Sequence, residues 1–147
     1  MKNFLRRIFA KKYTGKITYK QYQLAIESHR AWKMRFIRIL QGNENLSKLQ
    51  PKELACPQSC PLGQWINSPE TRQLTQHPDF VRLLDVHEHF HRAASKTLRL
   101  AMEKRGREVT FQLSHYGEFE RTSLELTRCL HHLHHEHVTT APATVDF

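Results

Sequence analysis

Long apolar runs and paired cysteines are both scarce in this sequence. Among its 147 residues, no apolar stretch approaches the length of about 18 residues that a membrane-spanning helix needs. The opening MKNFLRRIFAKK is charged, and its apolar stretch is too short for a secretory signal. Three cysteines do not suggest a disulfide framework, and Cys129 lies where a small apolar core residue is expected. We therefore expect a single cytoplasmic domain.

Strand-like alternation and internal repeats are also missing. Apolar residues recur instead with helical period. The predicted helices cover residues 18–41, residues 78–106, and residues from 108 to the histidine-rich stretch 131–137. Their predicted buried stripes comprise Tyr22, Ile26, Trp32, Phe36 and Leu40, then Phe80, Leu84, Ala94, Leu98 and Met102, then Leu113, Tyr116, Leu126, Leu130 and Leu133. These stripes predict an all-α protein folded as an antiparallel helical bundle.

Glycine and proline divide the chain between the predicted helices. Gly42 is expected to stop the first helix and Gly106 the second. Between residues 43 and 75, four prolines and Gly63 interrupt any long helix. This proline-rich segment is therefore predicted to be a loop with one short helical turn at 62–67.

Positive charge exceeds negative charge by a wide margin. Lysine and arginine number 23 against 14 acidic residues, for a formal net charge of +9. The basic residues are scattered along the predicted helices and no nucleic-acid-binding motif accompanies them, so we expect no nucleic-acid partner. In residues 1–16, basic residues surround Phe4, Leu5, Ile8 and Phe9. This segment is either an interfacial helix able to contact a membrane or a frayed basic leader.

Three histidines and a cysteine lie in short, distinctive phrases: His29 in HRAW, Cys60 in CPLGQW, and His87 and His91 in HEHFH. His87 and His91 are one helical turn apart, so their imidazoles project toward one point on the apolar face. His29 lies on the apolar face of the first helix. A lone histidine there is usually a hydrogen-bonded core residue, but three with one cysteine match the ligands that zinc prefers. Because unpartnered imidazoles are costly to bury, we expect a shared metal.

The stretches AIESHRAWKMRF, CPLGQWI and HPDFVRLLDVHEHFHRAA, in this order, resemble the bacterial chemoreceptor zinc-binding domain family over residues 19–133. The resemblance implies a four-helix bundle that binds one zinc through His29, Cys60, His87 and His91. It implies Cys60 as the ligand, rather than Cys56, because Cys60 precedes PLGQW.

Around this implied site we expect two tryptophans, Trp32 and Trp65, to form an apolar shell. The domain itself is expected over residues 17–137. A basic segment, 1–16, would precede it and a frayed tail, 138–147, would follow it.

The resemblance implies a sensor of zinc or of oxidants such as hypochlorous acid, in chemoreceptor or cyclic-di-GMP signalling. The zinc-binding domain would fill nearly all of this sequence. We therefore expect it to signal by binding another chain, either as a homodimer or in a complex with such a signalling protein. Zinc keeps Cys60 as the thiolate, the form that oxidants attack. In a partly accessible loop, Cys60 would be oxidised before Cys129, with Cys56 as a possible redox partner.

Two other functions compete with a sensor. The first is an interaction adaptor with a purely structural zinc. The second is a metallohydrolase, because HEHFH fits HExxH with Glu88 as general base and Glu108 as a possible third ligand. A closed shell of one cysteine and three histidines leaves no position for water, so we expect no enzyme. The stretch 131–137 is expected to be an exposed helix end, where His131 and His135 could bind a second metal weakly.

Overall fold

The computed structural model describes residues 17–42 and 46–140, and all regular elements in this part are helical. The long helices are α2 (Tyr19–Leu40), α5 (Pro78–Met102) and α7 (Glu118–Thr140). The short ones are α3 (Pro51–Leu54), α4 (Pro61–Ile66) and α6 (Gly106–Leu113), with 3-10 helices at Leu46–Lys48, Pro57–Ser59 and Pro69–Leu74. The predicted all-α class is confirmed. Within the described ranges, no helix has the length and hydropathy required to cross a membrane.

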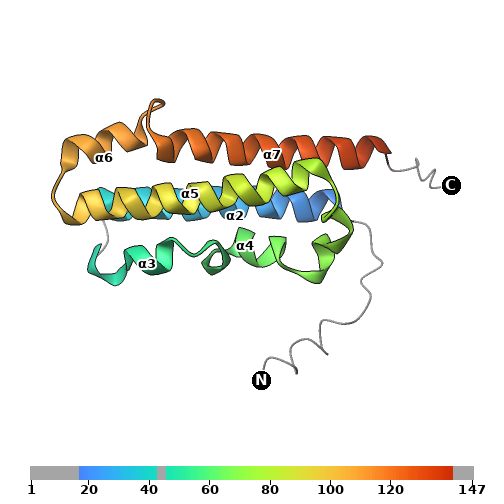
Figure 1. Ribbon diagram of the computed structural model, residues 1–147, viewed down its shortest axis with the longest axis horizontal. Coiled ribbons are helices and arrows are strands. Elements are labelled where there is room, and N and C mark those ends of the chain that lie inside the picture. The colour runs from blue at the N-terminus through green and yellow to red at the C-terminus, as the bar shows by residue number, and fades with distance from the viewer. Residues whose placement is uncertain (1–16, 43–45, 141–147) are drawn as a thin grey trace, which may run out of the picture.

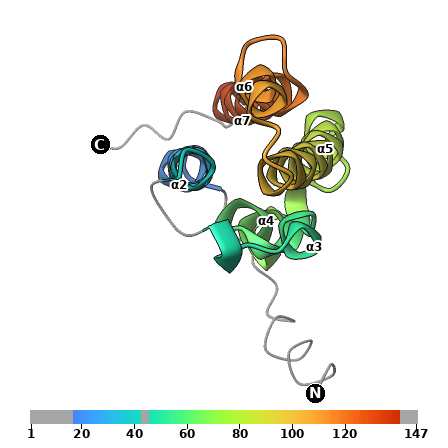
Figure 2. The ribbon, with the colours of Figure 1, turned by 90° about the vertical axis from the view of Figure 1, so that its left-hand side faces the viewer.

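The long helices lie along a common direction, with α3 and α4 forming a shorter row beside them (Figure 1). Viewed end-on, α2 and α5 lie on opposite sides, with α6 and α7 on a third side and α3 and α4 on the fourth (Figure 2). Helix α5 packs against α7, α3 and α6, whereas α2 packs against α4 and α7. The core therefore lies in the space that the four sides enclose.

Helix α2 begins and ends as its sequence predicts. The Thr18 side chain accepts a hydrogen bond from the Gln21 N–H, and the Gln21 side chain accepts one from the Thr18 N–H. This capping box satisfies two of the free N–H groups at the helix start. After the last turn, Gly42 adopts a φ of +80°, a left-handed conformation that favours glycine. The cap at Thr18 and the stop at Gly42 thus define one continuous helix. His29 lies in its fourth turn, on the buried face.

Helix α5 begins at Pro78, as predicted, but it ends at Met102, and the predicted end at Gly106 is wrong. The Arg105 N–H reaches back to the Leu100 carbonyl at 2.9 Å, and Lys104 takes a φ of 58°. This is a helix C-terminal motif that usually uses glycine. Because a lysine occupies the left-handed position in place of glycine, no residue at 102–105 marks the helix end in the sequence.

The predicted third helix is two helices, α6 and α7, so its prediction as one element is wrong. At Gly117 a Cβ atom would lie 2.3 Å from the Gln112 carbonyl oxygen, so the chain folds back closely there. The Gln112 side chain then accepts a hydrogen bond from the Phe119 N–H at 3.3 Å. This bond satisfies one free N–H in the first turn of α7.

The proline-rich segment is more helical than predicted. The expected turn at 62–67 is confirmed as α4, but α3 and the 3-10 turns fill much of the remainder. Pro51, Pro57, Pro61 and Pro69 each occupy the start of one of these short elements. Proline suits this position because the first N–H of a helix has no intrahelical partner. These prolines therefore begin helical turns as well as separating them.

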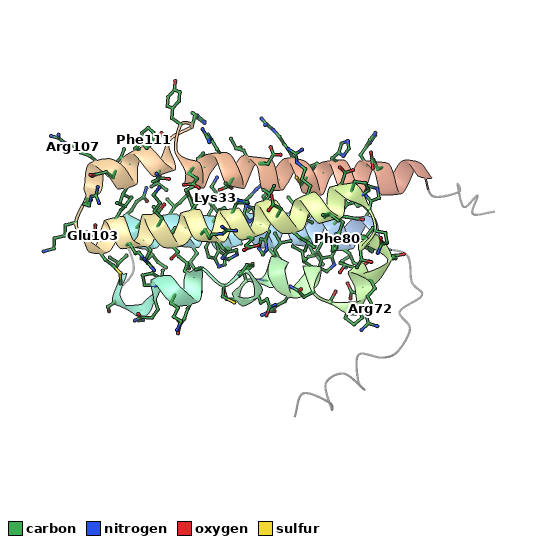
Figure 3. All side chains as sticks on the ribbon, in the orientation of Figure 1. Lys33, Arg72, Phe80, Glu103, Arg107 and Phe111 are labelled. Atoms are coloured by element: carbon green, nitrogen blue, oxygen red, sulfur yellow. The ribbon has the colours of Figure 1, made fainter. Side chains whose placement is uncertain are left out.

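The buried stripes agree with the prediction in part. On α7, Leu126, Leu130 and Leu133 are fully buried, and Figure 3 marks Phe80 of α5, which is 2% exposed. Leu84 and Met102 of α5, each 41% exposed, and Tyr116, 79% exposed, were wrongly placed in the core. The buried face of α5 follows Leu83, His87, Phe90, His91, Ala94 and Leu98. Leu84 lies to one side of this face, and Tyr116 lies in the turn between α6 and α7.

Candidate metal centre

Cys60 is buried at the start of α4, where it is the residue that caps the helix. The Gly63 N–H donates a hydrogen bond to its sulfur at 3.2 Å. A Cβ atom on Gly63 would lie 1.8 Å from the Pro57 carbonyl oxygen. Glycine is required here because the 3-10 turn before Cys60 lies directly against α4. This contact fixes the direction of the Cys60 sulfur.

His87 and His91 project from successive turns of α5 toward that sulfur. Their Nε2 atoms lie 3.2 Å and 3.3 Å from the Cys60 Sγ, respectively. His91 Nδ1 lies 2.8 Å from the Leu54 carbonyl oxygen, which can only accept a hydrogen bond. His91 therefore carries its proton on Nδ1, and its Nε2 presents a lone pair toward Cys60. A carbonyl in this role is the usual orienting partner of a metal-binding histidine.

The donor set and its spacing fit zinc. Tetrahedral zinc, with bonds of about 2.3 Å to sulfur and about 2.0 to 2.1 Å to nitrogen, separates these ligand atoms by roughly 3.5 Å. The sulfur-to-nitrogen distances of 3.2 Å and 3.3 Å are within a few tenths of that value. Cys60, His87 and His91 are all buried, and their ligand atoms lie within 4.8 Å of one another. Three side chains able to bind one metal ion are therefore already assembled.

His29 is buried beside this cluster, but its Nε2 has another partner. It lies 3.2 Å from the Ser123 hydroxyl oxygen on α7, and its ring packs edge-on against Phe90 at a centroid distance of 4.8 Å. The cluster within 4.8 Å comprises Cys60, His87 and His91. The structure thus brings three of the four expected ligands together and places the fourth next to them with its ring held by Ser123.

Burial keeps the imidazoles in the form that binds metal. Desolvation lowers the pKa of His29 and of His87 to about 3, with further lowering from neighbouring histidines. Burial also lowers the pKa of His91, although its hydrogen bond to Leu54 opposes the shift. All three are neutral at neutral pH. Burial raises the pKa of the Cys60 thiol, opposed by backbone N–H groups, and a bound cation would favour its thiolate.

Comparison with protein families agrees with this geometry. Residues 29–98 match the family described as the chemoreceptor zinc-binding domain. This part of the chain, 70 of its 147 residues, is similar to that domain. The matched range begins at His29 and includes Cys60, His87 and His91. Searches of curated proteins and of solved structures each found no match.

Two partly buried tryptophans pack against the hydrophobic core. The Trp32 ring lies 5.2 Å from the His91 ring and 5.4 Å from the Phe90 ring, measured between centroids. Trp32 thus places an apolar surface against His91. Trp65 packs edge-on against Tyr22 at 5.7 Å.

The three cysteines of the described residues are free thiols in different environments. Cys129 is 6% exposed, which confirms it as a core residue, and Cys60 is 3% exposed. The expected partly accessible position of Cys60 is therefore wrong, because α4 and α5 enclose its sulfur. Cys56 is exposed and lies close enough for its charge to raise the pKa of the Cys60 thiol. A redox pairing of Cys56 and Cys60 stays a prediction.

The carboxylates that a metallohydrolase would need are on the surface. Glu88 is exposed and accepts a hydrogen bond from Arg92 at 2.9 Å, one turn further along α5. Glu108, on α6, pairs with Arg105 at 3.1 Å. Neither belongs to the buried cluster of Cys60 and the two histidines. The HExxH pattern is therefore explained by two histidines one helical turn apart, and its glutamate points to solvent.

Three groups that position the ligands were missed in the sequence: the Leu54 carbonyl, the Gly63 N–H and the Ser123 hydroxyl. The first two are backbone atoms, whose direction depends on the packing of α3 and α4 and leaves no mark in a residue pattern. Ser123 did leave a signal. It follows Phe119 and precedes Leu126 on the buried stripe of α7, where a polar residue needs a partner.

Proposed function

We propose that this protein is a zinc-binding regulatory module of bacterial signalling. One observation carries the proposal: the Cys60 sulfur lies between the Nε2 atoms of two buried, neutral histidines, and the Leu54 carbonyl holds His91 in the zinc-binding tautomer. With His29 as a fourth ligand, this donor set would form a closed zinc site, which binds metal without leaving a position for a substrate. A regulatory module, rather than an enzyme, is the role that this site supports.

We propose that the complete ligand set is His29, Cys60, His87 and His91. His29 supports the set because it is buried, neutral and next to the other three. To join them, its ring would exchange the Ser123 contact for the metal. Bound zinc would supply a cross-link and keep Cys60 as the thiolate. The ligands come from α2, α4 and α5, which we propose to be sides of one antiparallel four-helix bundle.

Zinc availability is the signal that we propose. Without metal, Cys60 is held to α5 by neutral hydrogen bonds, which contribute only about 1 kcal/mol each. With metal, binding free energy adds directly to the stability of the α4 packing. Emptying the site would therefore loosen the proline-rich segment and change the surface that it forms.

A competition titration with a chromophoric zinc chelator tests this proposal. A sensor should release zinc to the chelator while far-UV circular dichroism shows the protein folded. Release that occurs only together with unfolding would identify a structural zinc in an interaction adaptor instead.

Oxidant sensing is a second candidate, favoured by the exposed Cys56 thiol near Cys60. Hypochlorous acid or peroxide would oxidise the Cys60 sulfur to a sulfenic acid. The Cys56 thiol would then condense with it, giving a disulfide and water. Because Cys60 is buried, this step requires the proline-rich segment to open first.

Peptide mass spectrometry with graded oxidant tests this candidate, with zinc release followed in wild type, Cys56→Ala and Cys60→Ser proteins. We expect Cys60 to be modified before Cys129, in step with zinc release. A Cys60 that resists oxidant while zinc stays bound would leave zinc level as the signal.

The output of the module is proposed to be association in the cytoplasm. We expect a homodimer, or a complex with a chemoreceptor or a cyclic-di-GMP signalling protein, and no nucleic-acid binding. Light scattering coupled to size exclusion, with and without zinc, tests dimerisation, and a pull-down under both conditions tests the partner. An oligomeric state and a set of captured partners that zinc leaves unchanged would contradict the proposed output. The prediction of a membrane contact through 1–16 lies outside the described residues.

A further inference from the structure

A second cluster of possible metal ligands lies between the start of α5 and the last turns of α7. It comprises His77 and Asp79 beside the first turn of α5, and His132 and Glu136 one turn apart on α7. We propose that these four residues form a second, weaker site for a divalent transition ion such as zinc. The site shares no residue with the family's zinc site, for which His29, Cys60, His87 and His91 are proposed as ligands.

The four side chains form a ring of polar contacts, in which each histidine meets Asp79 through Nδ1 and Glu136 through Nε2. His77 Nε2 lies 3.0 Å from a Glu136 oxygen, and its Nδ1 lies 3.7 Å from an Asp79 oxygen. His132 Nδ1 lies 3.0 Å from the same Asp79 oxygen, and its Nε2 lies 3.8 Å from Glu136. Ligand atoms of His77, Asp79 and Glu136 all lie within 4.8 Å of one another. With one nitrogen taken from each histidine, the separations of 3.0 Å from His77 Nε2 to Glu136 and from His132 Nδ1 to Asp79 are close to the roughly 3.3 Å between nitrogen or oxygen ligands in tetrahedral zinc.

The chemistry of the set selects the class of ion. Two imidazoles with two carboxylates suit zinc, cobalt and nickel, whereas magnesium and calcium prefer sites made wholly of oxygen. The carboxylates of Asp79 and Glu136 supply negative charge that a divalent ion would balance. The expected pair His131 and His135 is exposed and is not part of this cluster.

Two features make this site weaker than the buried one. Its side chains are between 25% and 59% exposed, so bound metal would exchange readily with solvent. His77 Nδ1 also accepts a hydrogen bond from the Asp79 N–H at 3.2 Å, as the cap of α5. To bind metal through Nε2, His77 would move its proton to Nδ1 and give up this cap. Metal binding would thus couple the end of α7 to the start of the helix that carries His87 and His91.

Cobalt binding to the protein already loaded with one zinc tests the inference. The buried site contains a thiolate and gives cobalt a sulfur charge-transfer band, whereas the proposed site contains only nitrogen and oxygen ligands. We expect one further cobalt per chain, with weak visible bands and no sulfur band. His132→Ala and Glu136→Gln should each weaken this binding at least tenfold. His131→Ala, a neighbouring exposed histidine on α7, is the matched control and should leave it unchanged.

Three results would overturn the inference. The first is no cobalt binding to the zinc-loaded protein at millimolar metal. The second is cobalt binding that His132→Ala leaves intact, or that His131→Ala weakens equally, which would indicate loose binding by exposed histidines. The third is a sulfur band, which would show that cobalt has entered the buried site. Circular dichroism checks that the variants fold, as expected for changes at partly exposed positions.

Discussion

Acid should destabilise the metal-free protein through its buried histidines. Burial lowers the pKa of His29 and His87 to about 3, from an ordinary value of 6.5. Below pH 6.5 the unfolded chain takes up a proton on each imidazole, but the folded chain does so only near pH 3. The unfolded state therefore binds more protons in this window, and the free energy of unfolding falls as the pH falls through it.

The size of the effect depends on how far the pH lies below 6.5, the pKa of histidine in the unfolded chain. At about pH 5, some 1.5 pH units below the unfolded pKa, each buried imidazole lowers the free energy of unfolding by about 2 kcal/mol. His29 and His87 together lower it by about 4 kcal/mol. Since domains of this size unfold with about 5 to 15 kcal/mol, the loss is a large part of the total.

Urea unfolding in the presence of a strong chelator, followed by far-UV circular dichroism between about pH 7.5 and pH 5, measures this loss. A His87→Gln variant removes one buried imidazole and should reduce the pH-dependent loss by about 2 kcal/mol. His89→Gln, at an exposed position on the same helix, is the matched control. A wild-type stability that does not change with pH, or identical pH profiles for the two variants, would refute the reasoning.

Two other variants test the positioning of the ligands. Gly63→Ala should cost more than about 3 kcal/mol of stability and weaken zinc binding, because its Cβ would lie 1.8 Å from the Pro57 carbonyl oxygen. Gly106→Ala, where a Cβ meets nothing within 4 Å, should be neutral or slightly stabilising in the same unfolding assay, and equal losses would contradict the close approach. His29→Ala should lower zinc affinity at least tenfold by chelator competition, and an unchanged affinity would remove His29 from the ligand set.

Local signals predicted those parts of the fold that depend on local chemistry. Thr18 and Gly42 mark the ends of α2 and Pro78 marks the start of α5, because caps and proline act within one turn. The spacing of His87 and His91 placed both on one face, since helical period alone decides this. The family resemblance supplied the choice of Cys60, which spacing alone could not have made.

Features that depend on contacts between distant residues were not predictable from such signals. The break between α6 and α7 depends on the close approach of Gly117 to Gln112, and the end of α5 depends on a left-handed Lys104. Likewise, Cys60 appeared accessible in a proline-rich segment, but packing of that segment on α5 buries it. The second cluster joins His77 and His132, which are 55 residues apart, so no short motif contains it.

Zinc stoichiometry tests the central claim most directly. Protein reconstituted with zinc, then dialysed against a weak chelator to clear loosely held metal, should retain about one zinc per chain by metal analysis. His87→Ala and His91→Ala should each abolish this retention, whereas His89→Ala, whose exposed ring lies 2.8 Å from the Asp85 carbonyl oxygen, should keep it. A wild-type protein that retains no zinc, or equal losses in all three variants, would contradict the account.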